Sequence, residues 1–333
     1  MKTIKIRRPD DLHVHFRLAE LMALVLWWTA RVFARALIMP NTVPDIATGA
    51  DALRYCAEIL GVAPSGFRPL MTIRLLPTTT PEIIREAHAA GVVAAKLYVG
   101  ITTGSTEGIS NLRTFAPVFA EMEKVGMPAS VHAEVPNAFC LDREADFIPE
   151  LRWLAQTFPK LKIVVEHVTD ADMVQAILDL PENVAGTITT HHLWLTLDNV
   201  IGGKLHPHDF CMPIAKRPED RDALRWAAMS GNPKFFFGSD TAPHEKDQKE
   251  CAEGCAGCFT APVALEALVE LFEREGKLEH LEAFVSEFGA RFYGLPLNEG
   301  TITLVREEWT VPELIGPIVP WMAGRTMLWK VVA

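Results

Sequence analysis

Short β-rich segments alternate with longer helical patterns along the chain, and this alternation constrains the fold more than any other feature. Several of the short segments, such as Val92–Ala95 and Phe235–Phe237, are apolar throughout, as expected of parallel strands buried on both faces. The eight predicted strands are Leu12–Phe16, Ala36–Met39, Pro69–Ile73, Val93–Tyr98, Ser130–Ala133, Ile163–His167, Gly186–Thr189 and Phe235–Gly238. Eight strands with intervening helices predict an α/β fold, a (β/α)₈ TIM barrel.

Helical patterns fall between these strands and continue after the last one. They cover Leu18–Phe33, Ala50–Ile59, Pro81–Ala90, Ile109–Val125, Glu144–Thr157, Ala171–Leu180 and Arg217–Ser230. Two more, Ala261–Glu275 and Leu278–Gly289, predict a C-terminal helical extension, and a tail punctuated by Pro and Gly with two apolar extended pieces follows. Neither a linker nor a repeat interrupts the pattern, so residues 1–333 are expected to form a single domain. A doubly wound sheet is disfavoured because no strand precedes a G-x-G-x-x-G or G-K-[ST] loop.

Composition narrows the class of protein. The chain is 49% hydrophobic and 22% charged, as in ordinary globular proteins. A formal net charge of −10 argues against a general binder of nucleic acid or anionic membranes, whereas a small anionic substrate remains compatible. The most apolar stretch, Leu21–Trp28, is too short to span a bilayer, and the basic N-terminus lacks the apolar run of a signal peptide. Six cysteines in 333 residues predict no disulfide scaffold, so a cytoplasmic location is expected.

Side chains suited to metal binding recur where the predicted strands end, which is where barrels of this type carry their chemistry. They are His13, His15 and Arg17 at the first strand, Asn41 after the second, Lys96 on the fourth, His132 on the fifth, Glu166 and His167 on the sixth, and Asp240 with His244 after the eighth. Alternation along a strand would place His13, His15 and Arg17 on one face. Each residue alone is more often a packed or hydrogen-bonded side chain; their joint placement favours a metal centre.

Lys96 is the most informative member of this set, because its strand contains almost no other polar residue. Burial disfavours the ammonium form and lowers the pKa, in extreme cases by ~3–5 units. A neutral amine beside metal ions can capture CO₂ as a carbamate, whose two oxygens can bridge two metals. The alternative is a salt-bridged barrel lysine, which would be favoured if the histidines were absent.

Zinc suits a site of imidazole and carboxylate ligands. His13, His15 and Asp240 would hold one ion, and His132 with His167 the other, while Lys96 and a water would bridge them. A bridging water has its pKa brought near neutrality and becomes a nucleophile. We expect Asp240 to accept its proton.

Three cysteines, Cys251, Cys255 and Cys258, occur close together and imitate a zinc knuckle. The other three cysteines lie far away in sequence, so a structural zinc site here is disfavoured. The preferred interpretation is a Gly/Ala-rich loop that brings backbone amides over the mouth of the barrel.

The motifs taken together resemble the dihydroorotases of the amidohydrolase superfamily, in their short, single-domain bacterial type. The resemblance covers nearly the whole chain and rests on a specific set of motifs. They are His13-Val14-His15-Phe16-Arg17, Met39-Pro40-Asn41, Ala95-Lys96-Leu97-Tyr98, Val131-His132-Ala133-Glu134, Glu166-His167 and Gly238-Ser239-Asp240-Thr241-Ala242-Pro243-His244.

The resemblance implies two zinc ions per subunit, bridged by N6-carboxylated Lys96 and a hydroxide, with Asp240 as the catalytic acid and base. It implies the reversible cyclisation of N-carbamoyl-L-aspartate to (S)-dihydroorotate in de novo pyrimidine biosynthesis, by a cytoplasmic homodimer. The implied metal ligands are His13, His15, Lys96, His132, His167 and Asp240. The implied substrate contacts are Arg17, Asn41 and His244 to the carboxylate, Met212 and Ala256 to the ring, and Thr102 and Thr103 from a mobile loop after Tyr98.

Two alternatives share these features. A hydantoinase-like enzyme would use the same metal ligands, but such enzymes carry β-strands before the first histidine pair, and only twelve residues precede His13 here. A substrate without a carboxylate would also leave Arg17, Asn41 and His244 unexplained. A catalytically dead binding protein of the same fold is disfavoured because no proposed ligand position is substituted.

Overall fold

The computed structural model describes residues 2–99, 109 and 111–332. Eight consecutive strands form one sheet in the order β2 to β9, and every pair of neighbours is parallel. The strands are β2 (Asp10–Val14), β3 (Arg35–Ile38), β4 (Arg68–Arg74), β5 (Ala94–Tyr98), β6 (Ala129–His132), β7 (Ile163–Val165), β8 (Val184–Ile188) and β9 (Phe235–Phe237). The predicted barrel is confirmed. Thr102 and Thr103, with the loop expected to be mobile, lie outside the described residues.

The segment after β9 brings the end of the sheet back to its beginning. Val14 pairs in parallel with Thr241, the His15 amide donates to the Thr241 carbonyl at 2.9 Å, and the Asp240 amide donates to the His13 carbonyl at 2.9 Å. The barrel is thereby nearly closed. This contact places Asp240 beside His13 and His15, which are more than 220 positions earlier in the sequence.

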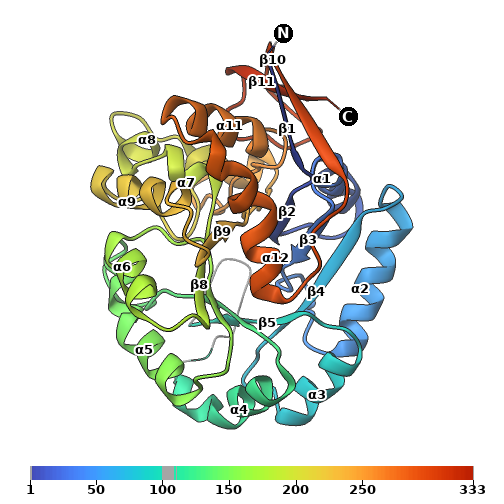
Figure 1. Cartoon of the computed structure of the whole chain (residues 1–333), viewed down its shortest axis with the longest axis vertical. Coiled ribbons are helices and arrows are strands. Elements are labelled where there is room, and N and C mark those ends of the chain that lie inside the picture. The colour runs from blue at the N-terminus through green and yellow to red at the C-terminus, as the bar shows by residue number, and fades with distance from the viewer. Residues whose placement is uncertain (1, 100–108, 110, 333) are drawn as a thin grey trace.

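The helices cover the outside of the barrel, and Figure 1 shows α2 to α6 arranged around the lower part of the sheet. Their bounds are α1 (Ala19–Ala30), α2 (Gly49–Val62), α3 (Pro81–Ala89), α4 (Ala116–Val125), α5 (Ile148–Thr157), α6 (Ala171–Asp179), α7 (Thr190–Trp194), α8 (Leu197–Ile201), α9 (Pro218–Met229), α10 (Lys246–Lys249), α11 (Ala264–Arg274) and α12 (Phe288–Tyr293). Each predicted helix has a counterpart here except Leu278–Gly289, which is a 3₁₀ turn at Leu278–His280 and a π-helix at Ala283–Glu287 that continues into α12. The sequence did not indicate α7, α8 and α10, because four or five residues are too few to show a helical period.

The tail beyond the C-terminal helices is a sheet rather than loose chain. Strand β10 (Thr301–Thr310) pairs antiparallel with both β1 (Thr3–Arg7) and β11 (Thr326–Val332). Figure 1 shows this three-stranded sheet at the top of the view, where both termini lie. The first of the two strands in the tail therefore pairs with the N-terminal strand and the second pairs with the first, an arrangement that no local pattern encodes. Among the described helices, none is long and apolar enough to cross a membrane.

Helix α12 packs against the barrel strands β2 and β9. Leu12 and Phe236 belong to an apolar cluster of barrel side chains, and Phe288, Phe292 and Tyr293 of this helix pack against that cluster. Close approach requires Gly289, because a Cβ at that position would meet the Leu12 side chain and lie 2.9 Å from Cδ2 of Phe236. The C-terminal helices therefore support the strand that carries His13.

We predict that Gly289→Ala lowers the free energy of unfolding by about 1–3 kcal/mol, because the added methyl overpacks the contact with Leu12 and Phe236. Gly61→Ala is the matched control. Gly61 is also helical, but a Cβ there meets nothing within 4 Å, so this substitution should stabilise by about 0.5–1 kcal/mol. Urea unfolding followed by circular dichroism measures both, and stabilisation by Gly289→Ala would contradict the packing described.

Candidate metal centre

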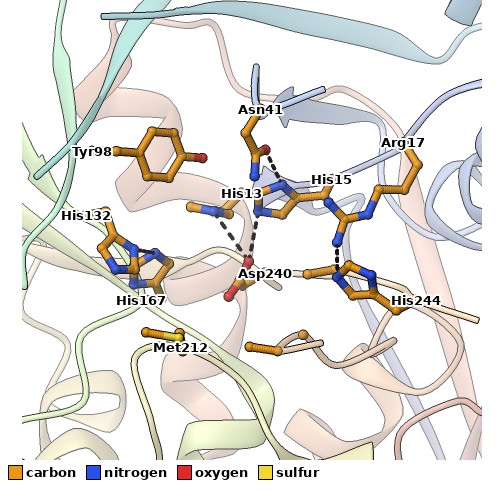
Figure 2. Close-up of a pocket in the computed structure, with 13 residues that line it drawn as sticks. His13, His15, Arg17, Asn41, Tyr98, His132, His167, Met212, Asp240 and His244 are labelled. Atoms are coloured by element: carbon orange, nitrogen blue, oxygen red, sulfur yellow. Dashed lines mark hydrogen bonds and ion pairs between the residues drawn. The ribbon is translucent and has the colours of Figure 1, made fainter. Parts of the chain in front are cut away.

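His13, His15 and Asp240 form one half of a candidate metal centre. All three are buried, and one ligand atom of each lies within 4.8 Å of the others. The Oδ1 atom of Asp240 is 3.5 Å from His13 Nε2 and 3.1 Å from His15 Nε2. Figure 2 shows both rings directed towards this carboxylate. The geometry is that of three ligands facing one point.

The other nitrogen of each ring is held in place. His13 Nδ1 lies 2.8 Å from Glu166 Oε2, and His15 Nδ1 lies 2.7 Å from Asn41 Oδ1. Since both partners are acceptors, each Nδ1 donates its proton to its partner, and each Nε2 is directed at Asp240, where a bound metal would take the place of an Nε2 proton. The buried Nε2 of His13 has no hydrogen-bond partner among the described residues. Metal-binding histidines are oriented in this way by a carboxylate or amide behind them.

His132 and His167 form the second half. His132 Nε2 lies 2.9 Å from Glu134 Oε2, so its Nδ1 is the free lone pair, and this atom is 3.2 Å from Nε2 of His167. Burial lowers the pKa of His167 well below its ordinary value, so the ring is neutral. The His167 ring lies 5.0 Å from the His13 ring and 4.8 Å from the His132 ring, centroid to centroid. The two halves therefore adjoin.

Lys96 is completely buried, and no described residue makes a hydrogen bond to its Nζ atom. Burial lowers the pKa of its amine to about 8, although the carboxylates of Glu166 and Asp240 oppose the shift. The side chain therefore has the two properties that carbamate formation requires, an accessible neutral form and an amine without a competing partner. The structure leaves its carboxylation as a prediction.

These side chains fit a pair of zinc ions. The donor set consists of imidazoles and a carboxylate, and unpartnered polar atoms of His13 and Lys96, Nε2 and Nζ, occur within it. Burying such atoms without a partner is costly, and bound cations would satisfy them. The side chains therefore match zinc in the kinds of ligand atom they offer and in the directions in which they point.

Backbone strain is concentrated at the same place. Arg17, His167 and Asp240 have φ angles of 62°, 43° and 45°, in the left-handed region that non-glycine residues rarely adopt. Such strain costs about 1–3 kcal/mol per residue and persists mainly at functional sites. Two of the predicted strands also end earlier in the structure than the sequence indicated. Strand β2 ends at Val14 and β7 at Val165, so His15, Arg17 and His167 lie on the turns that follow these strands.

The predicted substrate residues line the same cavity. Its lining includes Arg17, Asn41, Met212, His244 and Ala256 together with the five histidine and aspartate ligands named above. Arg17 Nη2 lies 2.9 Å from His244 Nε2, and its Nε atom donates to the Pro243 carbonyl at 3.0 Å. In Figure 2 this pair lies on one side of Asp240 and the His132–His167 pair on the other. Of the predicted site residues that the structure describes, all except Lys96 line this cavity.

Comparison with known proteins identifies the family. A family profile described as "Amidohydrolase" matches residues 17–190. The dihydroorotase of Sphingopyxis alaskensis is 46% identical over 336 residues, which cover 99% of each chain. The chain belongs to the dihydroorotase family.

Solved dihydroorotases share the fold over their whole length. The Campylobacter jejuni enzyme is 38% identical with a TM-score of 0.89, covering 99% of this chain and 97% of that one. The Saccharomyces cerevisiae enzyme, solved in complex with 5-fluoroorotic acid, is 33% identical with a TM-score of 0.93, covering 100% and 99%. Membership in this family makes the protein a hydrolase that acts on cyclic amides, and the amidohydrolase match implies dependence on a metal.

Sequence reasoning assigned no role to Glu134 and Glu166, the carboxylates behind the histidines of this dihydroorotase-family site. Glu134 follows His132 by two residues and Glu166 immediately precedes His167, so an acidic residue near each histidine was the available signal. Thr187 on β8 also donates to Glu166 at 2.7 Å. Tyr98, which lines the cavity, was likewise not predicted as a site residue.

The cysteine-rich loop reaches the cavity, as predicted. Lys249 Nζ donates to the carbonyls of Phe210, Cys255 and Gly257, which folds the loop back on itself. Ala256 and Gly257 consequently line the cavity. Within the described part of the chain, Cys251, Cys255 and Cys258 do not form a group of metal ligands.

We predict that Glu134→Gln weakens metal binding by about 10-fold to 100-fold, because His132 loses the carboxylate that orients it. Metal content after dialysis against graded concentrations of a chelator measures the effect. Exposed Glu58→Gln is the control and should leave affinity unchanged. Equal metal retention by the two variants would rule out this role of Glu134.

Proposed function

We propose that this enzyme catalyses the reversible cyclisation of N-carbamoyl-L-aspartate to (S)-dihydroorotate. One observation carries the proposal: a partly buried arginine–histidine pair suited to a carboxylate shares its cavity with five of the six predicted metal ligands. The names of the relatives agree with this substrate, and the yeast relative was solved with a pyrimidine carboxylic acid bound. A role in de novo pyrimidine synthesis, a cytoplasmic location and a homodimer belong to the proposal through resemblance alone.

Different residues of the chain would hold the two zinc ions. His13, His15 and Asp240 would hold one zinc ion, His132 and His167 the other, and carboxylated Lys96 would join them. Bound zinc would supply Lewis-acid polarisation of the amide carbonyl and a water acidic enough to act as a nucleophile at neutral pH. Glu166, Glu134 and Asn41 fix the ring orientations this requires, through the contacts described above.

Asp240 carries a proton from the attacking water to the departing ring nitrogen. Burial by itself would raise the pKa of this carboxyl, but the hydrogen bond from His15 and the nearby His13 and His15 rings outweigh burial, so the pKa lies below its ordinary value. The carboxylate is therefore ionised and able to accept the proton of the attacking water. It then donates this proton to the departing ring nitrogen, and the roles reverse during ring closure.

Arg17 and His244 select the substrate. Arg17 is positioned by its hydrogen bond to the Pro243 carbonyl and by Tyr55, whose hydroxyl donates to the Arg17 carbonyl at 2.5 Å. Burial, followed by the charge of Arg17, lowers the pKa of His244 to about 3, so its ring is neutral beside the guanidinium. A guanidinium can grip a carboxylate through two parallel hydrogen bonds. The amide of Asn41 completes the carboxylate site, and Met212 and Ala256 face the ring.

The two alternative functions leave some residues of the cavity without a role. A hydantoinase-like substrate without a carboxylate would give the Arg17–His244 pair nothing to bind. A catalytically dead binding protein would have no use for six retained ligand positions, nor for the strained backbone at His167 and Asp240.

Lys96→Ala is expected to lose nearly all dihydroorotate hydrolysis, because the bridge between the two metal positions disappears. Short carboxylic acids such as acetate should restore part of the activity by occupying the emptied space with two oxygens. The hydrolysis rate, measured with and without acetate, tests this. Asp240→Ala, which removes the proton carrier, should be inactive and not rescued. Full activity in Lys96→Ala would exclude the carbamate.

Arg17→Lys is expected to lower kcat/KM for dihydroorotate by about 10-fold to 100-fold, since a lysine cannot reproduce the two parallel hydrogen bonds to the carboxylate. Dihydrouracil, the same ring without the carboxylate, is the matched control substrate. Its slow hydrolysis should be unaffected by the substitution. An equal loss for both substrates would show that Arg17 does not read the carboxylate.

A further inference from the structure

A second group of buried ligand side chains shares no residue with the centre described above. His191 and His192 belong to α7, which follows β8, and Cys211 precedes Met212. Their relative exposures are 0%, 1% and 1%. One ligand atom of each lies within 4.8 Å of the other two. The proposed reaction uses none of the three.

Their spacing matches that of ligands around one ion. His192 Nε2 lies 3.2 Å from Cys211 Sγ, and the two imidazole rings are 4.2 Å apart between centroids. A nitrogen and a sulfur bound to the same tetrahedral zinc are separated by about 3.5 Å, given bonds of ~2.0 Å and ~2.3 Å. Only a small adjustment separates the observed arrangement from that geometry.

His191 provides the second, independent observation. Its Nδ1 atom is buried and has no partner in the described part of the chain. A fully buried ring nitrogen without a hydrogen bond is costly, and such groups in native proteins call for a missing partner such as an ion or a water. Burial also lowers the pKa of His191 to about 4, so the ring is neutral and able to act as a ligand.

Neighbouring groups hold both ring nitrogens of His192. Thr189 Oγ1 lies 2.8 Å from Nδ1, and Nε2, which lies 3.2 Å from Cys211 Sγ, donates to the Pro213 carbonyl oxygen at 3.0 Å. Metal binding at Nε2 would therefore move the ring proton to Nδ1, where the Thr189 hydroxyl can accept it and orient the ring. The hydrogen bond with Cys258, followed by burial, raises the pKa of the Cys211 thiol, so metal binding must displace the thiol proton.

We propose that His191, His192 and Cys211 bind a zinc ion separate from the binuclear centre. A thiolate with two imidazoles is a soft, nitrogen- and sulfur-containing donor set, which favours zinc over magnesium or calcium. The ion would tie α7 to the segment that carries Met212, one of the residues lining the cavity. Its role is structural, and the assignment does not depend on which cyclic amide the enzyme hydrolyses.

Cobalt substitution tests the site on the whole enzyme. The binuclear centre has only nitrogen and oxygen ligands, so a near-ultraviolet thiolate-to-Co²⁺ charge-transfer band reports a cysteine ligand alone. We expect wild-type protein titrated with Co²⁺ to develop this band. Cys211→Ser should abolish it, whereas Cys255→Ser, which removes a nearby thiol of the cysteine-rich loop, should retain it.

Several outcomes would overturn the assignment. These are the absence of a thiolate band in the wild type, its persistence in Cys211→Ser, or its loss in Cys255→Ser alone. Anomalous X-ray scattering at the zinc edge on wild-type crystals needs no variant, so it decides the matter even if Cys211→Ser does not fold. A zinc peak among the three side chains supports the site, and its absence at saturating zinc refutes it. Failure of the proposed reaction would appear separately, as a lack of dihydroorotate hydrolysis by protein that still shows the band.

Discussion

The mouth of this barrel concentrates ionisable side chains in a space that excludes water. Lys96, His13, His167 and Asp240 are each at most 5% exposed. Isolated charges at such burial are expensive, and the protein responds by keeping imidazoles neutral and by surrounding carboxylates with donors. Nε2 of His13 has no hydrogen-bond partner among the described residues, and a proposed zinc ion would satisfy it. Much of the local structure follows from this requirement.

Barrel closure makes the arrangement possible. The hydrogen bonds between the His13–His15 segment and Asp240–Thr241 join the last strand region to the first, and they set the distance between three ligands that sequence separates widely. Asp11 reinforces the junction by accepting from the amide and hydroxyl of Ser239. The left-handed backbone at Asp240 and His167 turns these side chains into the mouth, and the surrounding hydrogen bonds hold the strained conformation.

The carboxylates and amides behind the histidines give the site its precision. Glu166, Glu134 and Asn41 each fix one ring nitrogen and thereby decide which nitrogen remains for a metal. The oxygen of Asn41 orients His15, which leaves its amide nitrogen for the proposed contact with a substrate carboxylate. Thr189 does comparable work for His192 in the second cluster. Both groups of ligands therefore follow the same structural rule.

Sequence alone determined the eight strands and the barrel, and it placed the candidate ligands on or near the ends of those strands, because burial on both faces and the 3.6-residue helical period are local signals. Tertiary structure decided what those signals cannot encode. The pairing of β1 with β10, the turns that carry Arg17 and His167, and the roles of Glu134 and Glu166 all depend on contacts between distant segments. The same holds for His191, His192 and Cys211, which have no recognisable spacing and meet only because the loops after β8 fold together. Proximity across the fold is a property of packing, and a single sequence does not reveal it.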